Sequence, residues 1–280
     1  MENIIYLHGG VGGRTDYSER VRGYAMNSMT TDSLESAIHG VMQMEDDPDF
    51  NAGTGSYPRI DGSIQMDAAV MTESAFGSVI AIEQVRNPVL VARDVMEKSP
   101  HVMMSGDGAI EFARKMGHGF YDVSTERTME RHIKMMARLR EGTENLSEKE
   151  KFIRNIMGFG ESTGDTVGAI ARINGKFAVA VSTGGSVPML RGRVGDTPII
   201  GCGFYCGPKG GIVTTGIGEE ITKRMLCYNI YNQIGSDSLK NILEKAVKEF
   251  GDIHVGIIAV SRDEYASSAN GIMSTGIHIF

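Results

Sequence analysis

Three hydroxyl side chains, those of Ser162, Thr163 and Thr166, lie within one short glycine-containing stretch of the sequence. An alcohol of this kind attacks a carbonyl carbon once a nearby base removes its proton. Residues 160–164 also spell G-x-S-x-G, the nucleophile motif of serine hydrolases, which requires a strand before the serine and a helix after it. The order here is reversed, because a charged, helix-forming segment precedes Ser162 and a strand-like segment follows it. The serine motif is therefore interpreted as incidental.

Thr166 acquires a second kind of chemistry if the chain is cut before it. Scission between Asp165 and Thr166 would place a free α-amine next to the Thr166 hydroxyl. Such an amine has a pKa of about 7.7–8.0, close to the working pH of a general base, so one residue would supply both nucleophile and base. The plainer alternative is that Thr166 only begins a strand, and the residue taken alone favours that alternative.

Apolar periodicity and turn residues predict the strands and helices that must position Thr166. Strands are expected at Ile4–Leu7, Gln65–Met71, Ser78–Val85, Thr166–Ile173, Phe177–Ser182, Gly211–Thr215 and Val255–Ser261, with another near the C-terminus. Helices are expected from Asp32, where Glu35 completes a capping box, from Pro88, and over Asp107–Met116, Glu219–Ile234 and Ser238–Phe250. Asn174-Gly175 predicts a type I′ hairpin turn. Hairpins and paired helices favour an α+β fold over repeated βαβ units.

The chain is expected to form one domain over residues 1–280. Residues 124–155 are rich in charge and poor in β-branched side chains, which predicts a solvated helix or a mobile connector. The parts of the chain on either side of this connector look too incomplete to fold separately.

Charge and composition exclude several classes of partner. The formal charge of −7 disfavours nucleic acid or an anionic membrane as the main partner. We expect neither a signal peptide nor a membrane span, and hence a cytoplasmic location, because no apolar stretch approaches about 18–20 residues. Cys202, Cys206 and Cys227 are odd in number and unevenly spaced, so a structural role is expected rather than a disulfide framework.

Several longer motifs follow one another in a fixed order. They are His8-Gly9-Gly10, residues 46–56, 61–71 and 87–109, GDTVGAIA (164–171), STGG (182–185), GRVGDTPIIGCG (192–203) and TTGIGEE (214–220). Together they resemble the threonine-type N-terminal nucleophile hydrolases, the superfamily of plant-type asparaginases, isoaspartyl peptidases and glycosylasparaginases. The resemblance covers nearly the whole chain and implies a four-layer αββα sandwich. It also implies autoproteolysis into an α subunit (1–165, with the connector at about 124–165) and a β subunit (166–280).

The resemblance assigns catalytic roles to five residues. Thr166 would be the nucleophile, and Thr183 beside it would orient its hydroxyl and amine. Asn51 would support the nucleophile region. The Thr215 hydroxyl and the Gly216 N–H would form the oxyanion hole.

Substrate recognition would rest on Arg193, Asp196 and Gly218. A guanidinium suits an α-carboxylate, and a carboxylate together with the Gly218 carbonyl suits an α-ammonium, so these groups would read both ends of an α-amino acid. A surface ion pair is the alternative interpretation of Arg193 and Asp196.

The reaction implied by the resemblance releases L-aspartate from L-asparagine, from β-aspartyl (isoaspartyl) dipeptides or from both, through a Thr166 acyl-enzyme. It requires a small-molecule substrate and no organic cofactor. Three alternatives stay open: a glycosylasparaginase, a threonine endopeptidase of the same superfamily, and an unprocessed non-catalytic homologue.

The resemblance carries two further expectations and leaves two questions. A structural sodium ion would bind backbone carbonyls of the loop after the Asp32 helix, and the cut αβ units would pair as a homodimer. The expected sodium ligands are Met44, Glu45, Asp47, Phe50, Ala52 and Thr54. Cys206-Gly207-Pro208-Lys209 departs from the usual pattern of the relatives, which leaves the shape of the pocket rim in question. Asp165 is hypothesised to assist the cut by positioning or by proton transfer.

Overall fold

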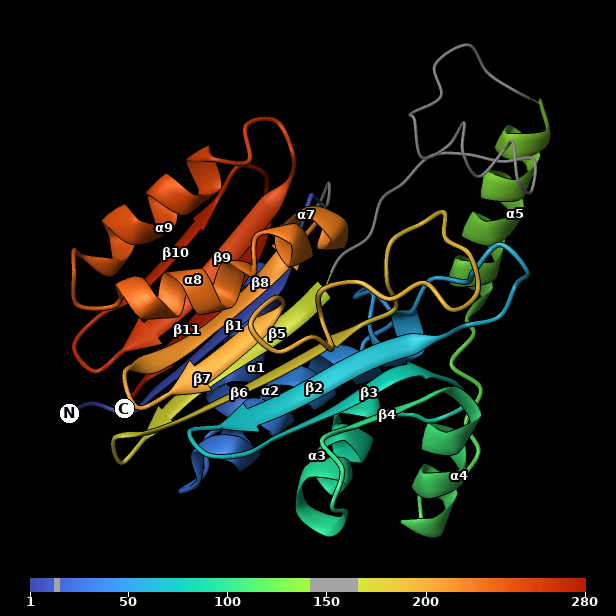
Figure 1. Cartoon of the computed structure of the whole chain (residues 1–280). Coiled ribbons are helices and arrows are strands. Elements are labelled where there is room, and N and C mark those ends of the chain that lie inside the picture. Colours follow the sequence, from blue (N-terminus) through green and yellow to red (C-terminus); the bar gives the residue numbers. More distant parts are fainter. Residues whose placement is uncertain (13–15, 142–165) are drawn as a thin grey trace.

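Two β-sheets form the centre of the protein, and helices cover their outer faces (Figure 1). The computed structural model describes residues 1–12, 16–141 and 166–280. The larger sheet runs in the order β11 (Met273–Ile279), β1 (Ile4–Val11), β5 (Thr166–Ile173), β6 (Lys176–Thr183), β2 (Met66–Thr72), β3 (Phe76–Ile82) and β4 (Met103–Ser105). The smaller sheet runs in the order β10 (Tyr265–Ala269), β9 (Val255–Ser261), β8 (Gly210–Gly216) and β7 (Phe204–Gly207).

The helices divide between the two outer faces. Against the larger sheet pack α1 (Ser18–Asn27), α2 (Ser33–Asp46), α3 (Pro88–Lys98) and α4 (Gly106–Lys115). Against the smaller sheet pack α8 (Leu226–Gln233) and α9 (Leu239–Lys248), preceded by the short α7 (Gly218–Lys223). The Asp32 side chain accepts the Glu35 N–H at 2.9 Å, which confirms the predicted start of α2.

Apolar side chains on both faces of the central strands explain the four layers. On β5, Val167, Ala169 and Ala171 join the core beneath α1, α2 and α3. Ile170, which points the other way, joins the core between the two sheets. A third core fills the space between the smaller sheet and helices α8 and α9. The predicted αββα sandwich is therefore confirmed.

The β5–β6 hairpin lies in the middle of the larger sheet. Its strands pair from Thr166 opposite Thr183 to Ile173 opposite Lys176. The φ angles of Asn174 and Gly175 are 51° and 73°, as the predicted type I′ turn requires. On its two outer sides the hairpin is hydrogen-bonded to β1 and to β2, so strands from after residue 166 lie between strands from before it in one sheet.

The predicted bounds of the first strand and of the helix over Glu219–Ile234 are wrong. The first strand continues past Leu7 to Val11, because β5 pairs with it as far as His8 and β11 pairs with it as far as Val11, across a bulge that contains its glycines. The expected single helix over Glu219–Ile234 is two helices. Met225 between them has a φ of 42°, which no α-helix accommodates.

The connector begins as a helix, α5 (Glu126–Glu141), which stands away from the sheets (Figure 1). Arg127 is bonded to Asp49, and Arg131 is bonded to the Tyr57 hydroxyl and stacks on its ring. The helical prediction holds for this part of the connector. Residues 142–165, including Ser162, Thr163 and Asp165, lie outside the described residues.

Candidate active site

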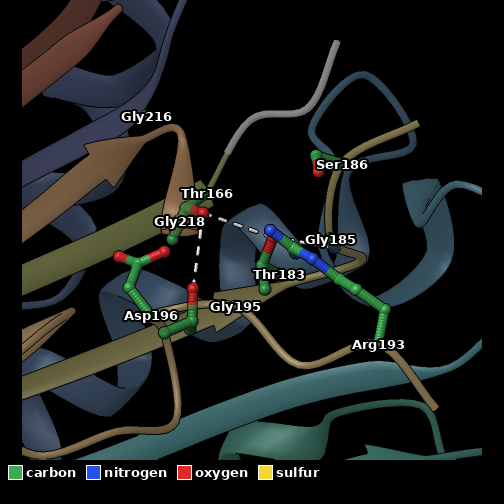
Figure 2. Close-up of a pocket in the computed structure, with 10 residues that line it drawn as sticks. Thr166, Thr183, Gly185, Ser186, Arg193, Gly195, Asp196, Gly216 and Gly218 are labelled. Carbon is green, nitrogen blue, oxygen red and sulfur yellow. Dashed lines mark hydrogen bonds between the residues drawn. The ribbon is translucent and has the colours of Figure 1, made fainter. Parts of the chain in front are cut away.

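Thr166 is the first residue of β5, and it lies where the open end of the hairpin reaches a pocket. Residues directly opposite each other in an antiparallel pair project to the same face, which brings the side chains of Thr166 and Thr183 together. The Thr166 hydroxyl donates to Thr183 Oγ1 at 3.3 Å and lies 3.4 Å from Thr197 Oγ1 (Figure 2). Thr166 is only 6% exposed, and that small opening faces the pocket.

Asn51 holds the turn that follows Thr183. The Asn51 side-chain amide donates to the Gly185 carbonyl at 2.6 Å, and the Asn51 carbonyl accepts the Gly184 N–H at 2.9 Å. The Gly185 N–H in turn donates to Thr183 Oγ1 at 3.0 Å. A Cβ on Gly184 would lie 2.4 Å from Asn51 Oδ1, so only glycine allows this approach. Asn51 therefore lies behind the pocket wall, where it fixes Thr183.

Arg193 reaches the pocket from the loop between β6 and β7 (Figure 2). Its Nε and Nη2 donate to the Glu219 carboxylate at 3.0 and 2.7 Å, so Glu219 holds one edge of the guanidinium. Its Nη1 lies next to Gly195, where a Cβ would be 2.8 Å away. The loop is anchored by the Gly192 N–H, which donates to Gln65 Oε1 at 2.7 Å.

Asp196 faces Arg193 across the pocket and is 3% exposed, so the interpretation of a surface ion pair does not describe it. Burial raises the pKa of its carboxyl to about 7, although Arg193 opposes that shift. The Thr214 hydroxyl donates to Asp196 Oδ2 at 3.5 Å. A Cβ on Gly218 would lie 2.8 Å from Asp196 Oδ1, so this glycine opens the space above the carboxylate.

The end of β8 supplies the third wall of the pocket, through Gly216 and Gly218. Gly216 has a φ of 144°, and a Cβ there would lie 2.4 Å from the His254 carbonyl oxygen, so glycine is required. Thr215 is fully buried and does not line the pocket. Its Oγ1 accepts the Thr166 N–H at 3.4 Å, which is the nitrogen that a cut before Thr166 would release as an amine.

The pocket thus joins most of the residues that the sequence singled out. Its lining consists of Thr166, Thr183, Gly185, Ser186, Arg193, Gly195, Asp196, Thr197, Gly216 and Gly218. Sequence reasoning missed the roles of Ser186 and Thr197. Ser186 directly follows the STGG motif (182–185) and Thr197 lies inside GRVGDTPIIGCG (192–203), and those positions are the signal that could have found them.

The loop between α2 and the 3₁₀ turn Gly53–Gly55 brings backbone carbonyl oxygens close to its two glycines. A Cβ on Gly55 would lie 1.9 Å from the Phe50 carbonyl oxygen and 2.7 Å from that of Pro48. A Cβ on Gly53 would lie 2.4 Å from the Glu45 carbonyl oxygen. Backbone carbonyl oxygens of the kind found near these glycines are suitable ligands for a hard metal ion.

Three further groups of residues do not line the pocket. Gly207-Pro208-Lys209 forms the turn between β7 and β8, at the opposite end of β8 from Gly216, so this departure from the relatives does not border the pocket. The three cysteines are free and buried, as a structural role requires. His8 fills the space that Gly168 leaves, and burial lowers the pKa of its imidazole to about 3.

A family model described as asparaginase matches residues 18–276. The chain belongs to the asparaginase family. It is 38% identical over 235 residues to the plant-type L-asparaginase of Pyrococcus abyssi, covering 81% of this chain and 76% of that relative. It is 34% identical over 281 residues to the isoaspartyl peptidase/L-asparaginase of Danio rerio, covering 94% and 87%. For the isoaspartyl peptidase/L-asparaginase of Homo sapiens, the identity is 33% over 286 residues, covering 94% and 88%.

Membership in the asparaginase family agrees with the αββα fold and with the order of the sequence motifs. Within the ranges that the structure describes, no helix combines the length and apolar character needed to cross a membrane.

Proposed function

We propose that the chain cuts itself between Asp165 and Thr166 and then hydrolyses L-asparagine, β-aspartyl dipeptides or both, with release of L-aspartate. The observation that carries this proposal is a threonine hydroxyl in a small pocket between a guanidinium and a carboxylate, those of Arg193 and Asp196. The names of the relatives support the same substrates. Asp165 remains a hypothesised helper of the cut.

Two opposite charges would orient the substrate. The α-ammonium would bind Asp196 and the Gly218 carbonyl, and the α-carboxylate would bind the Nη1 side of Arg193, since Glu219 holds the Nε–Nη2 edge. Fixing both α-groups leaves the side-chain carbonyl to face Thr166. A residue inside a protein chain has neither a free α-ammonium nor a free α-carboxylate, so this pocket favours a small amino acid derivative over an endopeptidase substrate.

The nucleophile and its base would come from one residue. After the cut, the Thr166 amine takes the hydroxyl proton, Oγ1 attacks the amide carbon, and ammonia or an amine leaves with a proton. Water activated by the same amine then releases aspartate. We assign the oxyanion to the Gly216 N–H, which belongs to the pocket lining, and to the Thr215 hydroxyl, which would have to turn from the Thr166 nitrogen toward the pocket. Each such donor contributes about 3 kcal/mol. All of these groups belong to the protein, so the proposed reaction uses no organic cofactor.

A sodium ion fits this proposal as a structural element. The backbone carbonyls of the loop after α2 would hold it, and it would supply rigidity rather than reaction chemistry. The proposed ligands are Met44, Glu45, Asp47, Phe50, Ala52 and Thr54. The ion would steady Asn51, which lies in the same loop and bonds to the Gly184-Gly185 turn.

The test combines intact mass with product release. Purified protein should give fragments 1–165 and 166–280, ammonia from L-asparagine, and leucine from β-Asp-Leu. Thr166→Ala should remain one chain without turnover. Ser162→Ala is the matched control and should cut and turn over normally. Wild-type protein that cuts but releases nothing from either substrate would refute the proposed activity, and protein that never cuts would indicate the non-catalytic alternative.

Assembly and location are parts of the same proposal. We propose a homodimer of cut αβ units in the cytoplasm. Light scattering after size exclusion should give twice the mass of the 280-residue chain. A mass of one chain would contradict the dimer without affecting the proposed chemistry.

A further inference from the structure

Thr197 is a second threonine whose hydroxyl contacts the proposed nucleophile. Its Oγ1 lies 3.4 Å from Thr166 Oγ1, it lines the pocket, and it is 1% exposed. Neither the sequence motifs nor the mechanism above gives this hydroxyl a role.

The backbone holds Thr197 rigidly at this place. The Asp196 carbonyl accepts the N–H groups of Ile199 and Gly203 at 2.9 and 3.1 Å, which closes the turn around Thr197. A Cβ on Gly203 would lie 2.7 Å from Thr197 Cα, so glycine permits this close packing. Thr197 is therefore fixed as firmly as the neighbouring carboxylate that faces the substrate.

The direction of the hydrogen bond follows from a proton count. A threonine hydroxyl carries one proton, and Thr166 gives its proton to Thr183 Oγ1. The second contact of Thr166 Oγ1 then requires Thr197 as the donor. In the cut enzyme the Thr166 proton moves to the α-amine, which again leaves the oxygen as an acceptor.

We infer that Thr197 is a further catalytic residue, whose hydroxyl donates to Thr166 Oγ1 and stabilises that oxygen as the leaving group of the acyl-enzyme. This inference rests on the proposed Thr166 acyl-enzyme. In deacylation, water adds to the acyl carbon and gives a proton to the Thr166 amine. The C–Oγ1 bond then breaks, its electron pair goes to Oγ1, and the ammonium returns the proton. The hydrogen bond from Thr197 strengthens as charge develops on Oγ1.

A hydrogen bond of this kind affects the two half-reactions unequally. In acylation the amine is the poorer leaving group, so its departure limits the rate while Oγ1 stays bound to carbon, whereas in deacylation Oγ1 itself must depart. Removing it should slow deacylation more than acylation. The acyl-enzyme should then accumulate, and kcat and KM should fall together while kcat/KM changes little.

The test compares Thr197→Val, which keeps the shape, with Thr197→Ser, which keeps the hydroxyl. Cut Thr197→Val enzyme should lose about 10- to 100-fold in kcat, the loss typical of a hydrogen bond to a charged group. Its KM should fall in parallel, and intact mass during turnover should show an aspartyl adduct on the 166–280 fragment. Thr197→Ser should behave like wild type, with equal melting temperatures for both variants.

Two outcomes would overturn the inference. One is a Thr197→Val enzyme with wild-type kcat, and the other is a loss of kcat at unchanged KM without any adduct. A Thr197→Val chain that stays uncut while Thr197→Ser cuts, at matched melting temperatures, would also contradict the inference, because the hydroxyl would then be needed in the first acyl transfer. Failure of the proposed function is distinct, since wild-type enzyme itself would then release no product.

Discussion

The two ends of the β5–β6 hairpin are built in opposite ways. At the turn end, two adjacent residues with positive φ, Asn174 and Gly175, reverse the chain by their own conformational preferences. At the open end, Thr166 and Thr183 face each other, and residues distant in sequence determine their surroundings. Those residues include Asn51, Thr197 and Thr215.

The two ends of the same pair of strands therefore have different roles, one in stability and the other in the chemistry of the site. The turn end contributes to the folding of the hairpin and lies far from the pocket. The open end gathers polar groups that do little for the core but converge on one hydroxyl. We therefore expect substitutions at the open end to reduce activity and substitutions at the turn end to reduce stability.

The largest effect is expected for Thr183→Val at the open end. Valine keeps the β-branched shape and the strand, but it removes the acceptor of the Thr166 proton. We expect kcat to fall about 100- to 1,000-fold, as for the loss of one preorganised polar group in an active site. Steady-state kinetics and a thermal melt check this. If the melting temperature falls while kcat stays normal, the open end contributes to stability rather than to activity, contrary to our expectation.

The next largest effect is the pH dependence of ligand binding. Because burial raises the pKa of Asp196 to about 7, its carboxylate becomes protonated as the pH falls below 7 and no longer pairs with an α-ammonium. At pH 5, about 1% is ionised, so L-aspartate should bind about 100-fold more weakly than at high pH. Succinate, which lacks the amine, is the control for competitive inhibition. Equal weakening of both ligands would argue against Asp196 as the group responsible.

Arg193→Lys should have a smaller effect at the same end. Lysine keeps the charge but loses the planar fork that contacts Glu219 and leaves a second edge for a carboxylate. KM should rise about 10- to 100-fold with a smaller change in kcat. Measuring kcat and KM with L-asparagine tests this prediction. An unchanged KM would show that Arg193 does not bind the substrate.

The smallest effect is expected at the turn end, for Gly175→Ala. Its φ of 73° disfavours a side chain, so the free energy of unfolding should fall by about 1 kcal/mol and Tm by about 2–4 °C. Activity per folded molecule should not change. Asn174→Gly is the matched control, because glycine adopts the same conformation without strain. A loss of kcat in Gly175→Ala would show that the two ends are coupled.

Most of the fold could be predicted because its signals are local or periodic. The Asp32 cap, Pro88 at the start of α3 and the Asn174-Gly175 turn each act through neighbouring residues. The break at Met225 could not be predicted in this way. There the Tyr228 N–H bonds to the distant Gly201 carbonyl at 2.9 Å, so tertiary contacts override a continuous helical pattern.

The candidate site was predictable only as a set of motifs. Arg193 and Asp196 resemble any exposed ion pair when taken alone, and burial gives Asp196 its unusual pKa. Thr197 carried no separate signal, because its contact with Thr166 depends on how the loop after β6 folds back over β5. The site residues were assigned from the resemblance along the whole chain, because the spacing within any one motif did not identify them.

The central place of β5 and β6 also affects how the protein recovers from unfolding. An uncut chain refolds in a first-order reaction, because every strand of the larger sheet belongs to one molecule. After a cut before Thr166, β5 and β6 arrive on one fragment and their neighbours β1 and β2 on the other. The two fragments must then meet by diffusion, so the refolded yield should depend on protein concentration. Dilute cut protein would therefore stay unfolded after a heat pulse from which the uncut Thr166→Ala chain regains its fold.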